Sequence, residues 1–284
     1  MRRIGVIGSF IVAGSLGTWA LAAPRADDRA AAQPSLSRQL DLGVVAIEAE
    51  IAGDLVRSSG TVIGAEDELV VTSAHAVWGA STIRVTTGIG VLHGRIVARA
   101  PCDDLAVIDT QPRLPGLVAL RTGEAPAGDA LLTAIGRRRA GPGDVGETFV
   151  TIPVRQASAG GPARFDPVLP PLADAMRLDA SIVPEATGGP IVDRAGRLVA
   201  MAQVTDSPGA ARNTAVPWRT VRRRLDELRS GPQRLFVGWR SQYRCASAMN
   251  AYAAAGHPGF LPGSARLNAP VPATRLPGTE ELDE

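Results

Sequence analysis

The sequence contains no lysine: all 30 basic residues among its 284 residues are arginine. We attribute this absence to a GC-rich genome rather than to a chemical requirement. Because 28 acidic residues leave a formal net charge of only +2, the chain also lacks the positive excess that attracts nucleic acids and acidic surfaces. The composition therefore predicts no nucleic-acid partner.

Cysteine and histidine are scarce, with two and three residues. Their spacing matches no metal-ligand pattern, so we predict no metal site and no cofactor. His93 and His257 have no sequence context that indicates chemistry. Trp78, Trp218 and Trp239 are interpreted as packing residues rather than as a ligand cage.

A long uninterrupted apolar run is also missing. The apolar stretch near the N-terminus starts at Ile4, follows two arginines and is broken by Gly and Ser, while Ala20 and Ala22 fit an A-x-A cleavage pattern. We predict a signal peptide over 1–22 and no stable membrane span after cleavage; a retained anchor is the alternative. Residues 23–42 are predicted to form a linker. The mature protein is then expected to be secreted or to lie in the cell envelope.

Export would place the two cysteines in an oxidising environment. Cys102 and Cys245 can then pair, and we predict that they form a disulfide. Such a bridge would attach the C-terminal segment to the body of the domain.

Turn residues and short apolar runs are abundant. The chain has 31 glycines and 22 prolines, with 45% apolar and 20% charged residues, which is the composition of a globular protein. From Gly43 onward, short β-branched runs are separated by Gly, Pro or Asp. This pattern predicts an all-β sandwich or barrel.

Helical periodicity begins only at residue 217. Residues 217–231 predict a short helix that ends at a glycine, and 234–256 are expected to hold another. We assign 231–284 to a C-terminal helix and an extended, Pro-rich tail. The arginine triplets at 137–139 and 222–224 are predicted to be solvated, the first in a loop and the second on a helix face.

Three segments carry residue types suited to acyl transfer. His75 follows an apolar strand in VVTSAHAV, Asp103 and Asp104 precede one in CDDLAVID, and Thr187 lies in the turn VPEATGGPIVD. In acyl transfer an imidazole takes the nucleophile's proton, a carboxylate orients the imidazole, and backbone N–H groups stabilise the oxyanion. The order of histidine, acid and hydroxyl therefore indicates a candidate site.

Together these segments resemble the trypsin-like serine peptidases, particularly the bacterial HtrA group. TSAHAV resembles that family's T-A-A-H-V-V, DLAVI resembles D-L-A-V-L, and the stretch around Thr187 is similar to D-A-x-I-N-P-G-N-S-G-G-P. The resemblance covers 43–230 and implies two six-stranded antiparallel β-barrels with the site in the cleft between them. It implies that His75 is the base, that Asp104 rather than Asp103 is the acid, and that Thr187 occupies the nucleophile position.

The resemblance also implies substrate-binding residues. NTAVPW resembles the family's F-A-I-P stretch beside the specificity pocket, so Asn213, Thr214 and Ala215 are candidates. Ser181 aligns with the base of that pocket. Because Ser181 is uncharged, we expect small or apolar side chains to be preferred over Lys or Arg.

Two residues depart from the family pattern. Thr187 replaces the serine, and its extra methyl group restricts rotation of the side chain. Glu185 replaces a glycine whose backbone angle directs an N–H, beside that of Thr187, into the oxyanion hole. We therefore predict a secreted homologue with weak or no proteolytic activity that binds a polypeptide or protein ligand. The alternatives are an active endopeptidase that uses Thr187, His75 and Asp104, or an unrelated β-barrel binding protein. The remaining 231–284 are too few for the family's usual PDZ module.

Overall fold

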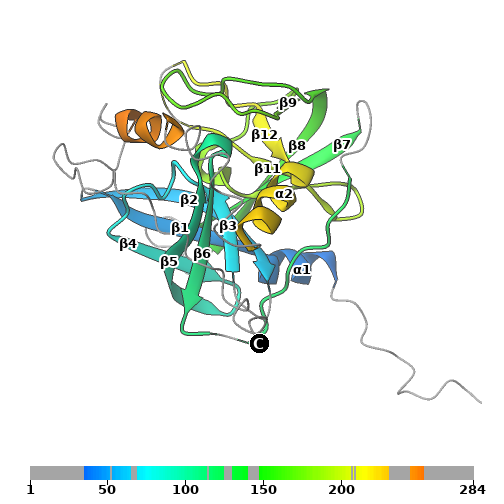
Figure 1. The fold of residues 1–284 in the computed structure, drawn as a ribbon. Coiled ribbons are helices and arrows are strands. Elements are labelled where there is room, and N and C mark those ends of the chain that lie inside the picture. Colours follow the sequence, from blue (N-terminus) through cyan, green and yellow to red (C-terminus); the bar gives the residue numbers. More distant parts are fainter. Residues whose placement is uncertain are drawn as a thin grey trace, which may run out of the picture. The chain divides into compact units, whose positions relative to one another are not determined.

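Two closed six-stranded antiparallel β-barrels make up most of the protein, which confirms the predicted all-β fold (Figure 1). The predicted signal peptide, Trp239, His257 and most of the Pro-rich tail lie outside the described residues. The computed structural model describes residues 35–51, 53–64, 69–113, 115–124, 130–139, 147–205, 207, 209–229 and 244–252.

The first barrel has the strand order β1-β2-β3-β6-β5-β4. Its strand β4 alternates between exposed and buried residues because one face looks to solvent, whereas all five residues of β3 are buried. The strands are β1 (Val44–Ile51), β2 (Asp54–Gly64), β3 (Leu69–Ser73), β4 (Thr82–Thr87), β5 (Gly90–Ala100) and β6 (Leu105–Gln111).

The second barrel has the order β10-β11-β12-β9-β8-β7. Its short apolar strands direct side chains such as Ile191 and Val199 into the core, where they are fully buried. Its strands are β7 (Leu131–Arg139), β8 (Glu147–Ala159), β9 (Met176–Leu178), β10 (Pro190–Val192), β11 (Leu198–Ala202) and β12 (Thr214–Pro217).

Helices lie at both ends of the described chain. Helix α2 (Trp218–Arg229) agrees with the helix predicted after residue 217, and residues 244–252 are helical within the second predicted segment. Helix α1 (Leu36–Gly43) differs from the predicted linker: the Ser35 hydroxyl accepts a hydrogen bond from the Arg38 N–H at its first turn. None of the helices among the described residues is long and apolar enough to cross a membrane.

Arg137 corrects the prediction that the triplet at 137–139 is a solvated loop. These residues end strand β7, and Arg137 is buried. Its guanidinium donates to the carbonyls of Asp41 and Val44, pairs with the Asp41 carboxylate at 3.2 Å and lies over the Phe149 ring. The second barrel is thereby joined to α1 and the start of β1.

The predicted disulfide between Cys102 and Cys245 is confirmed. It joins the loop before β6 to the C-terminal helix of residues 244–252. That helix also accepts a hydrogen bond at Asn250 from the Trp78 indole, and its Met249 is buried in the hydrophobic core. The C-terminal segment is therefore packed against the two loops that follow β3 and β5.

Candidate active site

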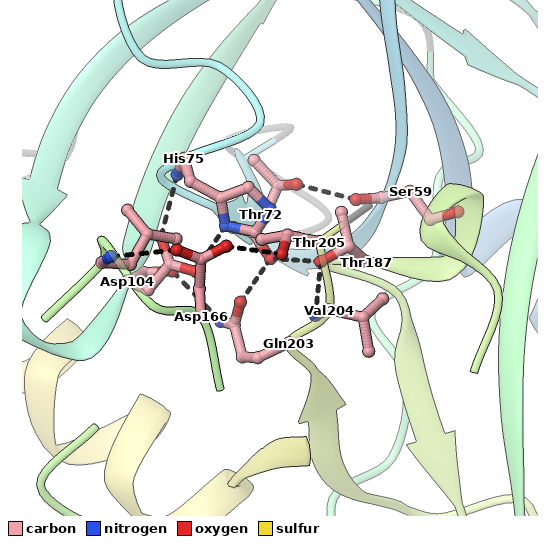
Figure 2. Close-up of polar contacts among 11 residues, drawn as sticks. Ser59, Thr72, His75, Asp104, Asp166, Thr187, Gln203, Val204 and Thr205 are labelled. Carbon is pink, nitrogen blue, oxygen red and sulfur yellow. Dashed lines mark hydrogen bonds and ion pairs between the residues drawn. The ribbon is translucent and has the colours of Figure 1, made fainter. Parts of the chain in front are cut away.

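His75 and Asp104 form a directly hydrogen-bonded pair (Figure 2). They come together because β3 pairs with β6, with Ser73 opposite Leu105, so the end of one strand lies beside the start of the other. Asp104 accepts from the His75 backbone N–H at 2.8 Å, and its other oxygen lies 2.6 Å from Nδ1. This geometry can hold the imidazole in one orientation for proton transfer.

The two acids of the predicted motif have different partners. Asp104 adopts a left-handed conformation (φ 52°), which aspartate tolerates better than most residues, directly after the 3-10 turn η2 (Pro101–Asp103). Asp103 is buried and pairs with Arg224 of α2 at 2.6 Å. The structure therefore gives Asp104 the contact with His75 and gives Asp103 a structural ion pair.

A second carboxylate, Asp166, affects His75. Its oxygens accept from the N–H groups of Val168 and Leu169 and from the Thr205 hydroxyl. Burial acts to raise the pKa of Asp166, but these hydrogen bonds and one from Ser207 outweigh burial and lower it. Asp166 is therefore a stable anion, and no sequence pattern indicated its role.

The pKa of His75 is raised above its ordinary value. Burial is the largest contribution and lowers it, but the charge and hydrogen bond of Asp104, the charge of Asp166 and a backbone hydrogen bond with Val204 together outweigh burial. The site thus stabilises the protonated imidazolium more than water does.

Two aromatic rings lie beside the His75 imidazole. The ring centroid of Phe165 is 6.0 Å away, and that of Tyr252, in an edge-on arrangement, is 6.1 Å away. Phe165 belongs to the segment between β8 and β9, and Tyr252 to the helix held by the disulfide. With these neighbours His75 is only 8% exposed.

The Thr187 hydroxyl is bonded away from His75. Thr187 Oγ1 lies 3.2 Å from the Ser73 hydroxyl and accepts from the Val204 N–H at 3.1 Å (Figure 2 labels Thr187 and Val204). Among the described residues, no hydrogen bond joins it to His75. Three residues aligned with a triad are therefore brought to one place, but only two of them form the expected contact.

The backbone before Thr187 forms the 3-10 turn η3 (Pro184–Ala186). In this turn the Thr187 N–H donates to the Pro184 carbonyl at 2.9 Å. Ser59 of β2 fixes the turn from the first barrel, because its hydroxyl donates to the Glu185 carbonyl at 2.7 Å and its N–H to the Thr187 carbonyl at 2.9 Å. The N–H that an oxyanion would need is already bonded within the protein.

Gly188 allows the chain to leave this turn. Its φ is +75°, and a Cβ there would collide with the Thr72 hydroxyl and the Ser59 carbonyl. The Gly-Gly-Pro segment therefore packs directly against β2 and β3, and the turn lies at the junction of the two barrels.

Comparison with known families agrees with this architecture. The profile of the trypsin-like peptidase domain matches residues 58–201, just over half of the chain. The chain belongs to this family. A search of curated proteins gave no match.

Solved proteases share the fold of this trypsin-like peptidase domain. The active form of the Rv3671c protease from M. tuberculosis is 23% identical over 68% of this chain and 83% of its own, with a TM-score of 0.54. The MamO protease domain from Magnetospirillum magneticum is 23% identical over 66% and 97%, with a TM-score of 0.53. The HtrA-type protease AlgW, with a tripeptide, is 24% identical over 69% and 64%, with a TM-score of 0.54. At these identities the similarity establishes the fold alone.

A pocket of about 210 Å³ opens at the candidate site of this trypsin-like domain. Its wall contains apolar side chains, two opposite charges and two members of the candidate triad, His75 and Thr187. The lining residues are Leu55, Val56, Arg57, His75, Ala76, Pro184, Glu185, Thr187, Val204, Thr205 and Tyr252.

The four predicted substrate-binding residues lie outside this lining. Ser181 is exposed, and Ala215 is buried in β12. Asn213 donates to the Leu178 carbonyl, while Arg177 donates to the Asn213 side chain and to the Thr214 hydroxyl. The role of these residues in specificity stays a prediction.

Other polar residues of the site were missed by sequence reasoning. Ser73 and Gln203 are fully buried and hydrogen-bonded to each other at 2.7 Å. Ser73 carried a signal, because it stands where the quoted family motif has alanine. Gln203 and Tyr252 had none. The described residues contain no group of three His, Cys, Asp or Glu that could hold a metal ion.

Proposed function

We propose that this protein is an exported member of the trypsin-like peptidase family with weak or no proteolytic activity, which binds a polypeptide in its cleft. The observation that carries the proposal is the state of Thr187, because both its hydroxyl and its N–H are bonded to groups other than those required for catalysis. The proposed export depends on the predicted signal peptide.

The hydroxyl is unsuited to attack for two reasons. A nucleophilic hydroxyl needs a hydrogen bond to its general base, and Thr187 instead bonds Ser73 and Val204. The extra methyl group of Thr187 also restricts the side-chain rotation that would bring its hydroxyl to His75. Both conditions slow the first step of acyl transfer.

The oxyanion site is unsuited to stabilise an intermediate. The Pro184 carbonyl, which is an acceptor, is bonded to the Thr187 N–H, so the peptide plane that should present a donor presents an oxygen. Glu185 hinders rotation of this plane because its side chain restricts the backbone angles that glycine allows. Loss of one oxyanion donor lowers the rate of a comparable protease by about 10² to 10³.

The cleft still supports polypeptide binding. The pocket is lined by exposed Leu55 together with Arg57 and Glu185, so it offers apolar contact and both signs of charge. A peptide chain presents the same mixture of apolar groups, amides and charges. We therefore assign a polypeptide segment as the ligand class.

Reaction with a fluorophosphonate probe tests this proposal. The probe needs an activated hydroxyl and a working oxyanion hole, so we expect the mature protein to be labelled slowly, at a rate close to that of His75→Ala. A Thr187→Val variant gives the background of labelling elsewhere. Fast labelling at Thr187 that disappears in His75→Ala would contradict the proposal.

An active endopeptidase is the second candidate, and the His75–Asp104 pair favours it. The contacts of 2.6 and 2.8 Å are those of an assembled base and acid. If the η3 turn rearranges on substrate binding, Thr187 could serve as nucleophile. Cleavage of an unfolded protein by wild type but not by Thr187→Val would support this candidate.

A further inference from the structure

Ser73 and Gln203 form a buried hydrogen-bonded chain between Thr187 and Asp104. The Gln203 side-chain nitrogen lies 3.1 Å from the Asp104 backbone carbonyl, and its oxygen lies 2.7 Å from the Ser73 hydroxyl. The Ser73 hydroxyl in turn lies 3.2 Å from that of Thr187. All three side chains are nearly inaccessible to solvent. Water therefore does not compete readily for these bonds.

The direction of each proton in this chain follows from its ends. A backbone carbonyl can only accept, so Gln203 must present its NH₂ group to Asp104 and its oxygen to Ser73. The amide oxygen can also only accept, so the single hydroxyl proton of Ser73 is donated to Gln203. Ser73 then has only lone pairs to offer to Thr187.

The proton of the Thr187 hydroxyl is thereby directed to Ser73. The Val204 N–H occupies the other side of Thr187 Oγ1 as a donor, so the hydroxyl accepts one bond and donates one. His75 lines the same pocket but receives no proton from this hydroxyl. Hydrogen bonds in such buried chains strengthen one another.

We propose that Ser73 and Gln203 are positioning residues that hold the Thr187 hydroxyl proton away from His75. This inference rests on the proposed loss of activity at the same site, and it names the side chains that maintain it. It assigns a role to the serine that replaces an alanine two residues before His75.

Removal of the chain should make His75 the acceptor of the Thr187 proton. A hydrogen bond from Thr187 to the neutral imidazole stabilises the neutral form, because the imidazolium has no lone pair to accept it. Asp104, Asp166 and the Val204 backbone, which favour the charged form, are still present. The pKa of His75 should therefore fall by about half to one unit, the size expected for one net hydrogen bond.

Titration of the His75 ring by ¹⁵N NMR tests the inference in the intact, oxidised protein. We expect the fall in pKa in Ser73→Ala and, independently, in Gln203→Met, in which Ser73 becomes free to donate to Thr187. Ser73→Thr keeps a hydroxyl and should keep the wild-type pKa. Thr61→Val is the matched control, because Thr61 carries a buried hydroxyl on β2 with no hydrogen-bond partner among the described residues.

An unchanged pKa of His75 in both Ser73→Ala and Gln203→Met would overturn the inference. So would an equal fall in Ser73→Thr or in Thr61→Val, since either would mean that the hydroxyl chain is not the cause. The titration requires no catalytic activity. Fluorophosphonate labelling of the wild type tests the proposed function, so the failure of one proposal is distinguishable from the failure of the other.

Discussion

The two halves of the candidate site differ in how much catalytic geometry they keep. One half, called the corner below, carries His75 and Asp104, and the other half is the η3 turn with Thr187 at its end. In the corner, two hydrogen bonds of 2.6 and 2.8 Å join base and acid. In the turn, the hydroxyl and the N–H of Thr187 are both bonded to other groups of the protein. One half of the candidate site has the arrangement that acyl transfer needs, and the other half does not.

The difference follows from what fixes each half. The pairing of β3 with β6, the Asp103–Arg224 ion pair and the disulfide all fix the corner, so its geometry is part of the fold. The turn is also held in place, by Ser59 and by the packing of Gly188, but its catalytic geometry depends on the orientation of one peptide plane and one hydroxyl. A small number of substitutions is therefore enough to disable the turn while the barrels and the base–acid pair persist.

Removal of the disulfide should have the largest effect, and mainly on the corner. Cys102 and Cys245 are 143 residues apart, and in the chain-entropy model a loop of this size contributes at most about 5 kcal/mol. In a Cys102→Ser, Cys245→Ser variant we expect the free energy of unfolding to fall by up to that amount. Urea denaturation measures the change. Wild type with reductant should approach the variant, and the variant should not respond to reductant.

Hydrogen exchange sharpens this prediction. Loss of the disulfide should release Tyr252 from His75. The protection of the His75 N–H from hydrogen exchange should therefore decrease more than that of the Thr187 N–H. An equal loss at both amides would show that the two halves are not fixed independently.

Repair of the turn should have the next largest effect. In Thr187→Ser, Glu185→Gly the peptide plane after Pro184 can rotate and free the N–H of residue 187, and the hydroxyl loses its methyl group. We expect fluorophosphonate labelling to rise by about 10² to 10³ over wild type, with only part of this gain in Thr187→Ser alone. His75→Ala added to the double variant should abolish the gain. Labelling no faster than in wild type would mean that the corner is also defective.

The sequence predicted the corner better than the turn because the two depend on information of different range. His75 follows one apolar strand and Asp104 precedes another, each within a recognisable local motif, and either end of a strand has a defined place in a barrel. The bonds of the Thr187 hydroxyl depend on Ser73 and Gln203, which are 130 residues apart and meet only after the barrels have packed. No local pattern specifies such a meeting.

Other residues whose environment the sequence did not predict have the same physical origin. Arg137 was predicted to lie in a solvated loop because its triplet has Gly and Pro nearby, but carbonyls of α1 and β1 supply enough acceptors to bury it. Asp166 was missed because its partners come from a segment without regular structure and from the residues after β11. Polar residues can be buried when tertiary contacts satisfy them, and the sequence alone does not display those contacts.

The pH dependence of stability gives the smallest expected effect, and it separates the two halves by sign. The folded-state pKa of His75 is above its unfolded value of about 6.5, so its contribution to stability is fully present below that pH and is lost as the pH rises through the folded pKa. We expect the unfolding free energy of wild type, relative to His75→Gln, to decrease above pH 6.5 by about 1.4 kcal/mol for each unit of pKa shift. In Asp104→Asn the two largest contributions that raise the pKa are removed, while burial, the largest contribution of all, remains. We therefore expect the folded pKa to fall below 6.5 and the relative stability to increase as the pH rises toward that value. Thr187→Val, which changes only the turn, should keep the wild-type slope. Urea denaturation at several pH values, with the disulfide intact, measures all four proteins, and a wild-type slope in Asp104→Asn would show that the base–acid pair does not control the charge of His75.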